Sequence, residues 1–183
     1  SSSSAASDVY KRQLERVEKN QTLLFQSLSQ APRHLIIPFQ THGTKILPVD
    51  EKFLGASGQQ QQEMLNGIDA LITTEPGCCI CISTADCIPV LLYDRVHHAV
   101  AAVHAGWRGT VEYIVGHTLE KMRAVFGTEG QDVIACIGPG ISLQSFEVGD
   151  EVYEAFRLNG FDMSRISFRL SLIHISEPTR QAE

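Results

Sequence analysis

Three short polar segments carry the residues with the clearest capacity for chemistry. His42, Cys87 and His104 lie at the ends of apolar runs or just beyond them, 45 and 17 positions apart. Imidazole and thiolate are good zinc ligands, and three protein ligands leave a fourth position for water or substrate. These residues therefore allow a catalytic zinc site.

Each of the three also has a plain structural explanation. A histidine before glycine is often a turn residue, a cysteine in an apolar strand is often a small core residue, and a histidine before Ala-Gly can cap a helix. Structural zinc sites usually take ligands in close local pairs, and Cys79 and Cys81 lack the two-residue spacer of a zinc knuckle. We interpret Cys78, Cys79, Cys81 and Cys136 as structural. The residue types alone leave both interpretations open.

Four further residues offer supporting roles. Asp86 could orient a ligand histidine, or it could cap the end of a buried strand. Arg108 follows Trp107 at an expected helix start, where free backbone N–H groups favour an anion such as phosphate; an ordinary surface arginine is the alternative. Gly138 and Gly140 indicate unusual backbone angles or a close approach to a ligand, with a simple turn as the alternative.

Apolar periodicity predicts the elements that must position these groups. Strand-length apolar runs occupy residues 34–39, 44–49, 69–74, 79–83, 88–93, 99–104 and 132–137, and helical stripes occupy 14–30, 111–126 and 148–158. We expect 44–49 to pair with 34–39 after a turn at Gly43, and near-continuous apolar strands to be buried on both faces. The polar segment 55–63 predicts a surface loop. Together these features predict an α/β fold, a layered mixed sheet flanked by helices in one domain.

Composition and charge restrict the function classes. The chain has 183 residues, 43% hydrophobic and 20% charged, which is typical of a soluble globular domain and excludes a disordered or collagenous chain. No apolar run has the length to span a bilayer, and a net charge of -6 argues against a nucleic-acid partner. Five unevenly clustered cysteines do not resemble a secreted disulfide framework. We therefore expect a cytoplasmic protein with reduced thiols and no nucleic-acid or membrane partner.

The two ends of the chain can be encoded by complementary DNA. Residues 8–13 can be encoded by GATGTGTATAAGAGACAG, and the reverse complement of that string translates to the residues at 170–175. The string resembles a transposon-type sequencing adaptor. We therefore expect residues 1–13 and 170–183 to be non-native, and residues 14–169 to be a partial catalytic domain truncated at both ends.

Five motifs between about residues 40 and 156 resemble the bacterial laccase-domain family, also called the polyphenol oxidase, peptidoglycan editing factor or YfiH-like family. They are QTHG at 40–43, GIDALIT at 67–73, TADCIPV at 84–90, HAGWRGT at 104–110, and IGPGI at 137–141 followed by FEVG at 146–149. The resemblance implies a zinc-dependent purine nucleoside phosphorylase with adenosine deaminase as a side activity. It implies that His42, Cys87 and His104 hold the zinc ion.

The resemblance also implies roles for neighbouring residues, with a purine nucleoside and phosphate as substrates. The implied catalytic residues are His42, Cys87, His104, Arg108 and Asp86, and the implied substrate-binding residues are Gln40, Arg108, Gly138 and Gly140. Family members usually have serine where this chain has Gly140. They also carry a Gly-rich loop before residue 14, and a Cys-Thr segment and an aromatic-Arg-Arg strand after residue 169. We expect a fragment without these parts to lack sheet edges and to be unstable or inactive.

Three other functions are compatible with some of the same residues. Cys87 could be a nucleophile with His104 as base and Asp86 as orienter, giving a hydrolase or amidase that acts on a peptidoglycan precursor. Copper-dependent phenol oxidation needs many histidines, and among the six between residues 14 and 169 only His97 and His98 are adjacent, so it is less favoured. A non-catalytic binding domain could use the helices at 111–126 and 148–158, whose stripes are more simply explained as core.

Overall fold

The computed structural model describes residues 15–17, 19–20, 22–23, 25–27 and 30–168. The predicted non-native segments 1–13 and 170–183 lie outside the described residues, as do Leu14, Leu24 and Leu28 of the first apolar stripe. The described residues between 15 and 27 are helical, as predicted, but they are exposed apart from the half-buried Phe25. In this part of the chain the helix is therefore not packed as the stripe suggested.

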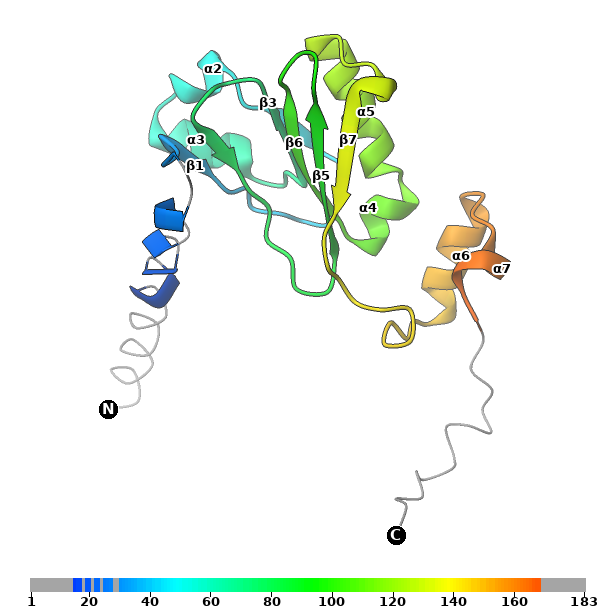
Figure 1. The fold of residues 1–183 in the computed structure, drawn as a ribbon. Helices are drawn as coiled ribbons and strands as arrows, with labels where there is room; N and C mark the ends of the chain where they lie inside the picture. Colours follow the sequence, from blue (N-terminus) through cyan, green and yellow to red (C-terminus); the bar gives the residue numbers. More distant parts are fainter. Residues whose placement is uncertain (1–14, 18, 21, 24, 28–29, 169–183) are drawn as a thin grey trace, which may run out of the picture.

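A five-stranded mixed sheet forms the centre of the fold (Figure 1). Its strands, in spatial order, are β2 (Ile46–Pro48), β3 (Ala70–Thr73), β6 (Val100–Ala105), β5 (Ile88–Asp94) and β7 (Val133–Ile137). Strands β2 and β3 run parallel, and every other neighbouring pair is antiparallel. Helices flank this sheet, so the predicted fold class, a mixed α/β single domain, is confirmed.

The predicted pairing of segments 34–39 and 44–49 is wrong. Strand β1 (His34–Ile36) pairs in parallel with β4 (Cys78–Ile80) in a separate two-stranded sheet, and β2 pairs with β3. The reason lies in the intervening loop, because the backbone N–H groups of residues 41–43 all donate to the side chain of Asp69. These three hydrogen bonds hold the loop beside Asp69, so the strand that follows it, β2, pairs with β3 and not with β1.

The helices after residue 50 are α2 (Glu51–Leu54), α3 (Gly58–Leu65), α4 (Trp107–Val111), α5 (Ile114–Phe126), α6 (Asp150–Leu158) and α7 (Met163–Ile166). They differ from the prediction at residues 55–63 and 111–126. The loop predicted at 55–63 is wrong, because Ser57 and Gln60 form a capping box that starts α3. The predicted helix 111–126 is divided because Tyr113 adopts a left-handed backbone conformation with φ 58°.

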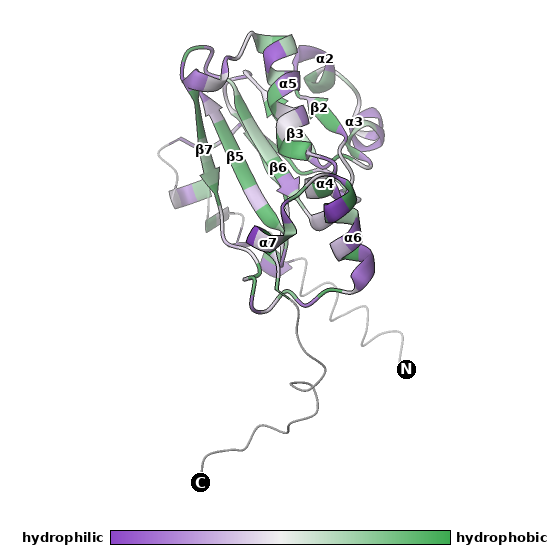
Figure 2. Cartoon of the chain, turned by 90° about the vertical axis from the view of Figure 1, so that its right-hand side faces the viewer, coloured by the Kyte–Doolittle hydropathy of each residue, from purple (hydrophilic) through white to green (hydrophobic). Residues whose placement is uncertain are grey.

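Two apolar clusters support the sheet. The larger one packs one face of β5 and β6 against Ile114 and Met122 of α5, and the smaller one surrounds Phe53 and Leu71. Figure 2 shows the apolar strands β5, β6 and β7 side by side. Burial on both faces is confirmed for β3 and most of β6, but it is wrong for β5, one face of which is exposed, and β7 is exposed at four of its five residues. Among the described helices, none has the length and hydropathy needed to cross a bilayer.

Candidate metal centre

The structure brings His42, Cys87 and His104 together at one end of the sheet. One ligand atom from each lies within 4.8 Å of those of the other two, and the two imidazole rings meet edge to face with centroids 4.8 Å apart. His104 is on β6, Cys87 directly precedes the adjacent β5, and His42 is in the loop between β1 and β2. Antiparallel pairing of β5 and β6, with Pro89 opposite His104, brings Cys87 to this end.

Gly106 makes this convergence sterically feasible. A Cβ atom at Gly106 would lie 3.0 Å from Cδ2 of His42 and 3.2 Å from Sγ of Cys87. These separations are tighter than an ordinary van der Waals contact, so any side chain would push the two ligand residues apart. The glycine of the HAGW segment therefore contributes space next to the three ligands.

A buried carboxylate, Asp69, organises two of the three ligands. It accepts hydrogen bonds from the backbone N–H groups of Thr41 at 3.2 Å, His42 at 2.9 Å and Gly43 at 2.8 Å. Nδ1 of His104 lies 2.8 Å from Oδ1 of the same carboxylate. A histidine that donates Nδ1–H to a carboxylate presents Nε2 as the free ligand atom. Asp69 therefore fixes both the His42 loop and the orientation of His104.

Asp86 was one candidate for this orienting role, with a strand cap as the alternative, but the structure places Asp69 beside His104. Asp86 is exposed, and within the described residues its carboxylate has no hydrogen bond to either histidine. The available signal was the position of Asp69 at the head of the apolar run 69–74, where a charged residue at the start of a buried strand requires a partner. The backbone of His42 also marks this region as a functional site, because its φ of 61° is uncommon for a residue other than glycine and such conformations cluster at functional sites.

A pocket of about 540 Å³ opens beside the three ligands. Cys87 is half-buried, His104 is only 3% exposed, and His42 is exposed at the rim. The residues that line the pocket are Gln40, His42, Ser83, Thr84, Ala85, Asp86, Cys87 and His104. The ligand atoms therefore face a cavity that a small molecule can enter.

Gln40 lines this pocket with its side-chain amide already engaged. Its Nε2 donates to the Ser83 carbonyl at 2.8 Å, and its Oε1 accepts from the Ser83 backbone N–H at 2.6 Å. These two hydrogen bonds join the loop before His42 to the loop before Cys87. The structure thus shows a positioning contact for a residue predicted to bind substrate.

Gly138 and Gly140 pack against the strand that follows Cys87. A Cβ atom at Gly138 would lie 2.7 Å from Cγ of Pro89, and one at Gly140 would overlap Cδ1 of Ile88. The neighbouring Ile141 N–H also donates to the Asp86 carbonyl at 2.9 Å. Neither glycine is among the pocket-lining residues in the described part of the chain. Their close approach is therefore to the backbone that positions Cys87.

Arg108 does not line the described pocket. It is exposed, and its Cζ atom lies 4.2 Å from the centroid of the Trp107 ring. This is a cation–π contact at the start of α4, two residues after Gly106. The structure therefore shows an exposed cation at the start of α4 that contacts the neighbouring indole ring.

The local field favours a protonated thiol at Cys87 when no cation is present. Burial raises the pKa of the Cys87 thiol, and the carboxylates of Asp86 and Asp69 raise it further. A bound cation would have the opposite effect, since a metal ion stabilises the thiolate. Two imidazoles, one thiol and the orienting carboxylate thus form a donor set that fits a zinc-type ion.

The other described histidines lie outside this centre. His97 contacts Asp94, His98 contacts the Tyr93 hydroxyl, and His117 contacts Glu120. Within the described ranges, His42, Cys87 and His104 form the one group of three side chains arranged to hold a metal ion.

Comparisons with known proteins place this centre in a family context. The family model described as multi-copper polyphenol oxidoreductase laccase matches residues 3–175. A purine nucleoside phosphorylase of Bacteroides thetaiotaomicron is 65% identical over 155 residues, which are 85% of this chain and 57% of that protein. Adenosine deaminase RL5, from an unknown prokaryotic organism, is 41% identical over 135 residues, which are 74% of this chain and 51% of that protein. The chain thus spans about half the length of the curated relatives it matches.

A solved structure shares the same fold. The hypothetical protein YfiH of Bacillus licheniformis superposes with a TM-score of 0.63 and 31% identity, over 70% of this chain and 48% of that chain. The resemblance predicted from five sequence motifs is confirmed. This chain belongs to the multi-copper polyphenol oxidoreductase laccase family, in its YfiH-like form.

Proposed function

We propose that this chain is the metal-binding part of a zinc-dependent purine nucleoside phosphorylase that also deaminates adenosine. The observation that carries the proposal is the convergence of His42, Cys87 and His104 beside a pocket of about 540 Å³. The names of the two relatives described above support the two activities. The proposed substrates are a purine nucleoside and phosphate, and the reaction for deamination uses water.

In this proposal His42, Cys87 and His104 hold the zinc ion. When bound, zinc would supply a Lewis acid that stabilises negative charge on oxygen. Asp69 keeps His104 in the orientation that presents Nε2, and its three backbone contacts hold the His42 loop against the sheet. Gln40 fixes the opposite wall through Ser83. The chain thereby supplies a preorganised centre, which reduces the reorganisation needed during reaction.

Arg108 is proposed to bind the phosphate substrate. In phosphorolysis a phosphate oxygen forms a bond to the anomeric carbon of ribose, and the bond from that carbon to the purine nitrogen breaks. The electron pair of the broken bond goes to the purine, which leaves after taking up a proton. The Arg108 guanidinium contacts the Trp107 ring at the start of α4, and we propose that it neutralises phosphate charge during attack.

Two alternatives receive less support from the geometry. A Cys87–His104–Asp86 hydrolase needs Asp86 beside the histidine, but Nδ1 of His104 is 2.8 Å from Asp69 instead. A multi-copper oxidase, which the family description names, needs more histidine ligands than the described residues bring together. We also propose a cytoplasmic location, which the five free thiols in the described part of the chain support.

The direct test measures both reactions on the zinc-loaded complete protein that contains this chain, because the chain alone spans about half the length of its relatives. Inosine and phosphate should give hypoxanthine and ribose 1-phosphate, and adenosine without phosphate should give inosine. Arg108→Ala should lower phosphorolysis by about 100-fold and leave deamination largely intact, because only phosphorolysis uses phosphate. Cys87→Ser should lower both. A complete protein that holds zinc and yields none of these products would overturn the proposed activities, and phenol oxidation after copper loading would favour the oxidase.

A further inference from the structure

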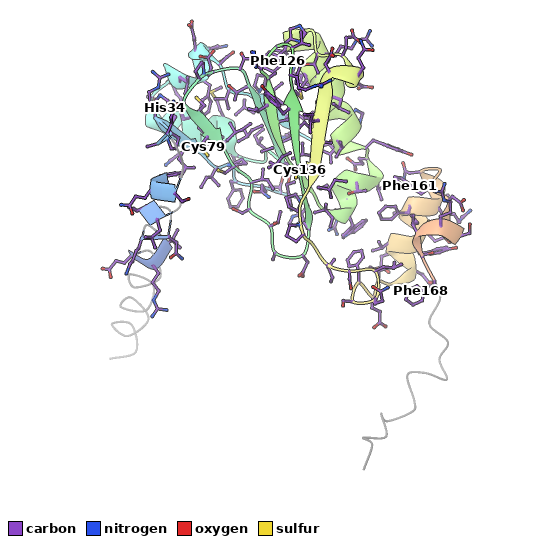
Figure 3. All side chains as sticks on the ribbon, viewed as in Figure 1. His34, Cys79, Phe126, Cys136, Phe161 and Phe168 are labelled. Carbon is purple, nitrogen blue, oxygen red and sulfur yellow. The ribbon has the colours of Figure 1, made fainter. Side chains whose placement is uncertain are left out.

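Two neighbouring thiols, Cys79 on β4 and Cys81 just after its end, lie outside the centre described above. The Sγ atoms of Cys79 and Cys81 are 3.6 Å apart, and both residues are half-buried. Figure 3 shows Cys79 near His34, in the part of the molecule that contains β1. Neither cysteine lines the pocket beside His104 within the described structure. The function proposed above gives this pair no role.

Strand alternation explains why these two thiols meet. Cys78 and Ile80 pack against the apolar cluster around Phe53, so the side chains of Cys79 and Cys81 point to the other side of the strand. The backbone N–H of Cys81 donates to the carbonyl of Ile36 at 2.9 Å, which keeps this segment beside β1 after β4 ends. The backbone pairing therefore holds the two sulfur atoms at a defined separation.

That separation suits chelation of one ion by both sulfurs. Two sulfurs bonded to one centre at about 2.3 Å lie about 3.3 Å apart when the bonds meet at a right angle and about 3.8 Å apart at the tetrahedral angle, and the observed separation falls between these values. A disulfide would instead require the two Cα atoms to approach, because residues two apart on a strand are separated by about 6.6 Å, near the upper limit for a disulfide. Chelation thus needs a smaller rearrangement than oxidation.

We propose that Cys79 and Cys81 form a dithiol site for thiophilic species that bond to two sulfurs, with trivalent arsenicals as the type ligand. Soft thiolate donors select such soft centres over harder ions. A monosubstituted trivalent arsenical accepts two thiolates and keeps one organic group, so the two cysteines complete its coordination. The site is independent of the His42, Cys87 and His104 centre.

The acid–base character of the pair supports chelation over thiol–disulfide exchange. Burial, followed by the hydrogen bond with the Cys79 thiol, raises the pKa of Cys81 to about 12. Exchange with an external disulfide requires a free thiolate, which is scarce at neutral pH for such a group. A thiophilic centre displaces the proton as the sulfur bond forms.

The proposed step with phenylarsine oxide is balanced without an oxidant. Two arsenic–sulfur bonds form, and both S–H bonds and the arsenic–oxygen bond break. The two thiol protons leave with the oxide oxygen as one water molecule. Arsenic remains trivalent, and neither sulfur is oxidised.

Titration of the 183-residue chain with phenylarsine oxide, followed by native mass spectrometry, tests the site. We expect one adduct per chain, reversed by a small dithiol such as dimercaptopropanol. Cys79→Ser and Cys81→Ser should each weaken binding by about 100-fold or more, because the second sulfur acts at a high effective concentration. Cys87→Ser and Cys136→Ser are the matched controls and should bind as the unchanged chain does.

Peptide mapping provides a readout that does not depend on the folding of a variant. After arsenical treatment of the unchanged chain, Cys79 and Cys81 should both be protected from alkylation under denaturing conditions, while Cys136 is modified. Binding that survives both serine variants, that is lost in Cys87→Ser, or that leaves Cys79 and Cys81 open to alkylation would overturn the proposal.

Discussion

Two buried aspartates at opposite ends of the β5–β6 pair make the same kind of contact with different results. Asp69 accepts three backbone N–H groups and lies 2.8 Å from Nδ1 of His104. Asp94 accepts the backbone N–H groups of Val96 and His97 and lies 2.8 Å from Nδ1 of His97. Both aspartates are fully buried.

The difference lies in sequence separation and exposure. Asp69 contacts residues 26 to 35 positions away, whereas the Val96 and His97 contacts of Asp94 span two or three positions. The His104 side chain is 3% exposed and the His97 side chain is 37% exposed. The Asp94 contacts shape a turn, while the Asp69 contacts draw distant ligands to one point. A buried Asp–His pair is therefore not sufficient to identify a site.

Removal of a ligand should produce the largest effect. Cys87→Ser and His42→Ala should each abolish stoichiometric zinc binding at a concentration that saturates the unchanged chain, since three ligands are needed to hold the ion. His97→Ala is the matched control at the Asp94 turn and should bind zinc normally. Equilibrium dialysis with metal analysis measures the effect, and full zinc occupancy in both ligand variants would refute the assignment.

Asp69→Asn should have the next largest effect on the metal centre. An amide can still contact the loop, but it loses the charge that orients and strengthens His104 as a ligand. We expect zinc affinity to fall by about 10- to 100-fold, the usual cost of removing such an outer-shell partner. Competition with a chromophoric chelator gives the constant. Asp86→Asn is the control, and a larger loss there than at Asp69 would reverse the assignment made from the geometry.

Asp94→Asn should reduce stability without changing zinc affinity. Burial would raise the pKa of Asp94, but the Thr128 hydroxyl, the His97 contacts and the Val96 N–H outweigh it and hold the pKa well below its usual range. A carboxyl whose pKa is lowered by folding stabilises the fold above its unfolded pKa, about 4, and the stabilisation is lost as pH falls below that.

Urea denaturation at several pH values checks the sign of this effect. The midpoint of the unchanged chain should exceed that of Asp94→Asn near neutral pH, and the gap should narrow as the solution is acidified below about pH 4. A constant gap across this range would show that the carboxylate charge does not stabilise the turn.

His97→Gln should have the smallest effect. The imidazole is partly exposed and its contact with Asp94 is one of several, so we expect a loss of less than about 1 kcal/mol in the free energy of unfolding. The same urea experiment measures it. A loss as large as that of Asp94→Asn would mean that the imidazole, and not the backbone contacts, holds the turn.

The sequence predicted the positions of strands and helices better than the pairing between strands. The apolar runs at 88–93 and 99–104 became β5 and β6 because each forms a long strand with several cross-strand neighbours. The pairing of β2 could not be read from periodicity, since it depends on contacts between residues 41–43 and Asp69. The helix α3 was missed because its polar composition hid the Ser57–Gln60 capping box.

The ligand residues of the candidate site were easier to predict from the sequence than the residues that position them. His42, Cys87 and His104 were candidates because imidazoles and a thiol stood at the ends of apolar runs, and the family resemblance implied that they act together; the structure brings them to one point. Asp69 was read only as a strand residue, because its function depends on a hydrogen bond to a histidine 35 positions away. Gly140 was assigned to substrate, whereas the tight space beside Ile88 explains it structurally.

X-ray absorption spectroscopy at the zinc edge would test the central claim most directly. The chain loaded with one equivalent of zinc should show one sulfur ligand at about 2.3 Å and two imidazole nitrogens at about 2.0–2.1 Å, with the sulfur signal lost in Cys87→Ser. A shell containing two sulfur ligands, or one without sulfur, would contradict a centre built from His42, Cys87 and His104.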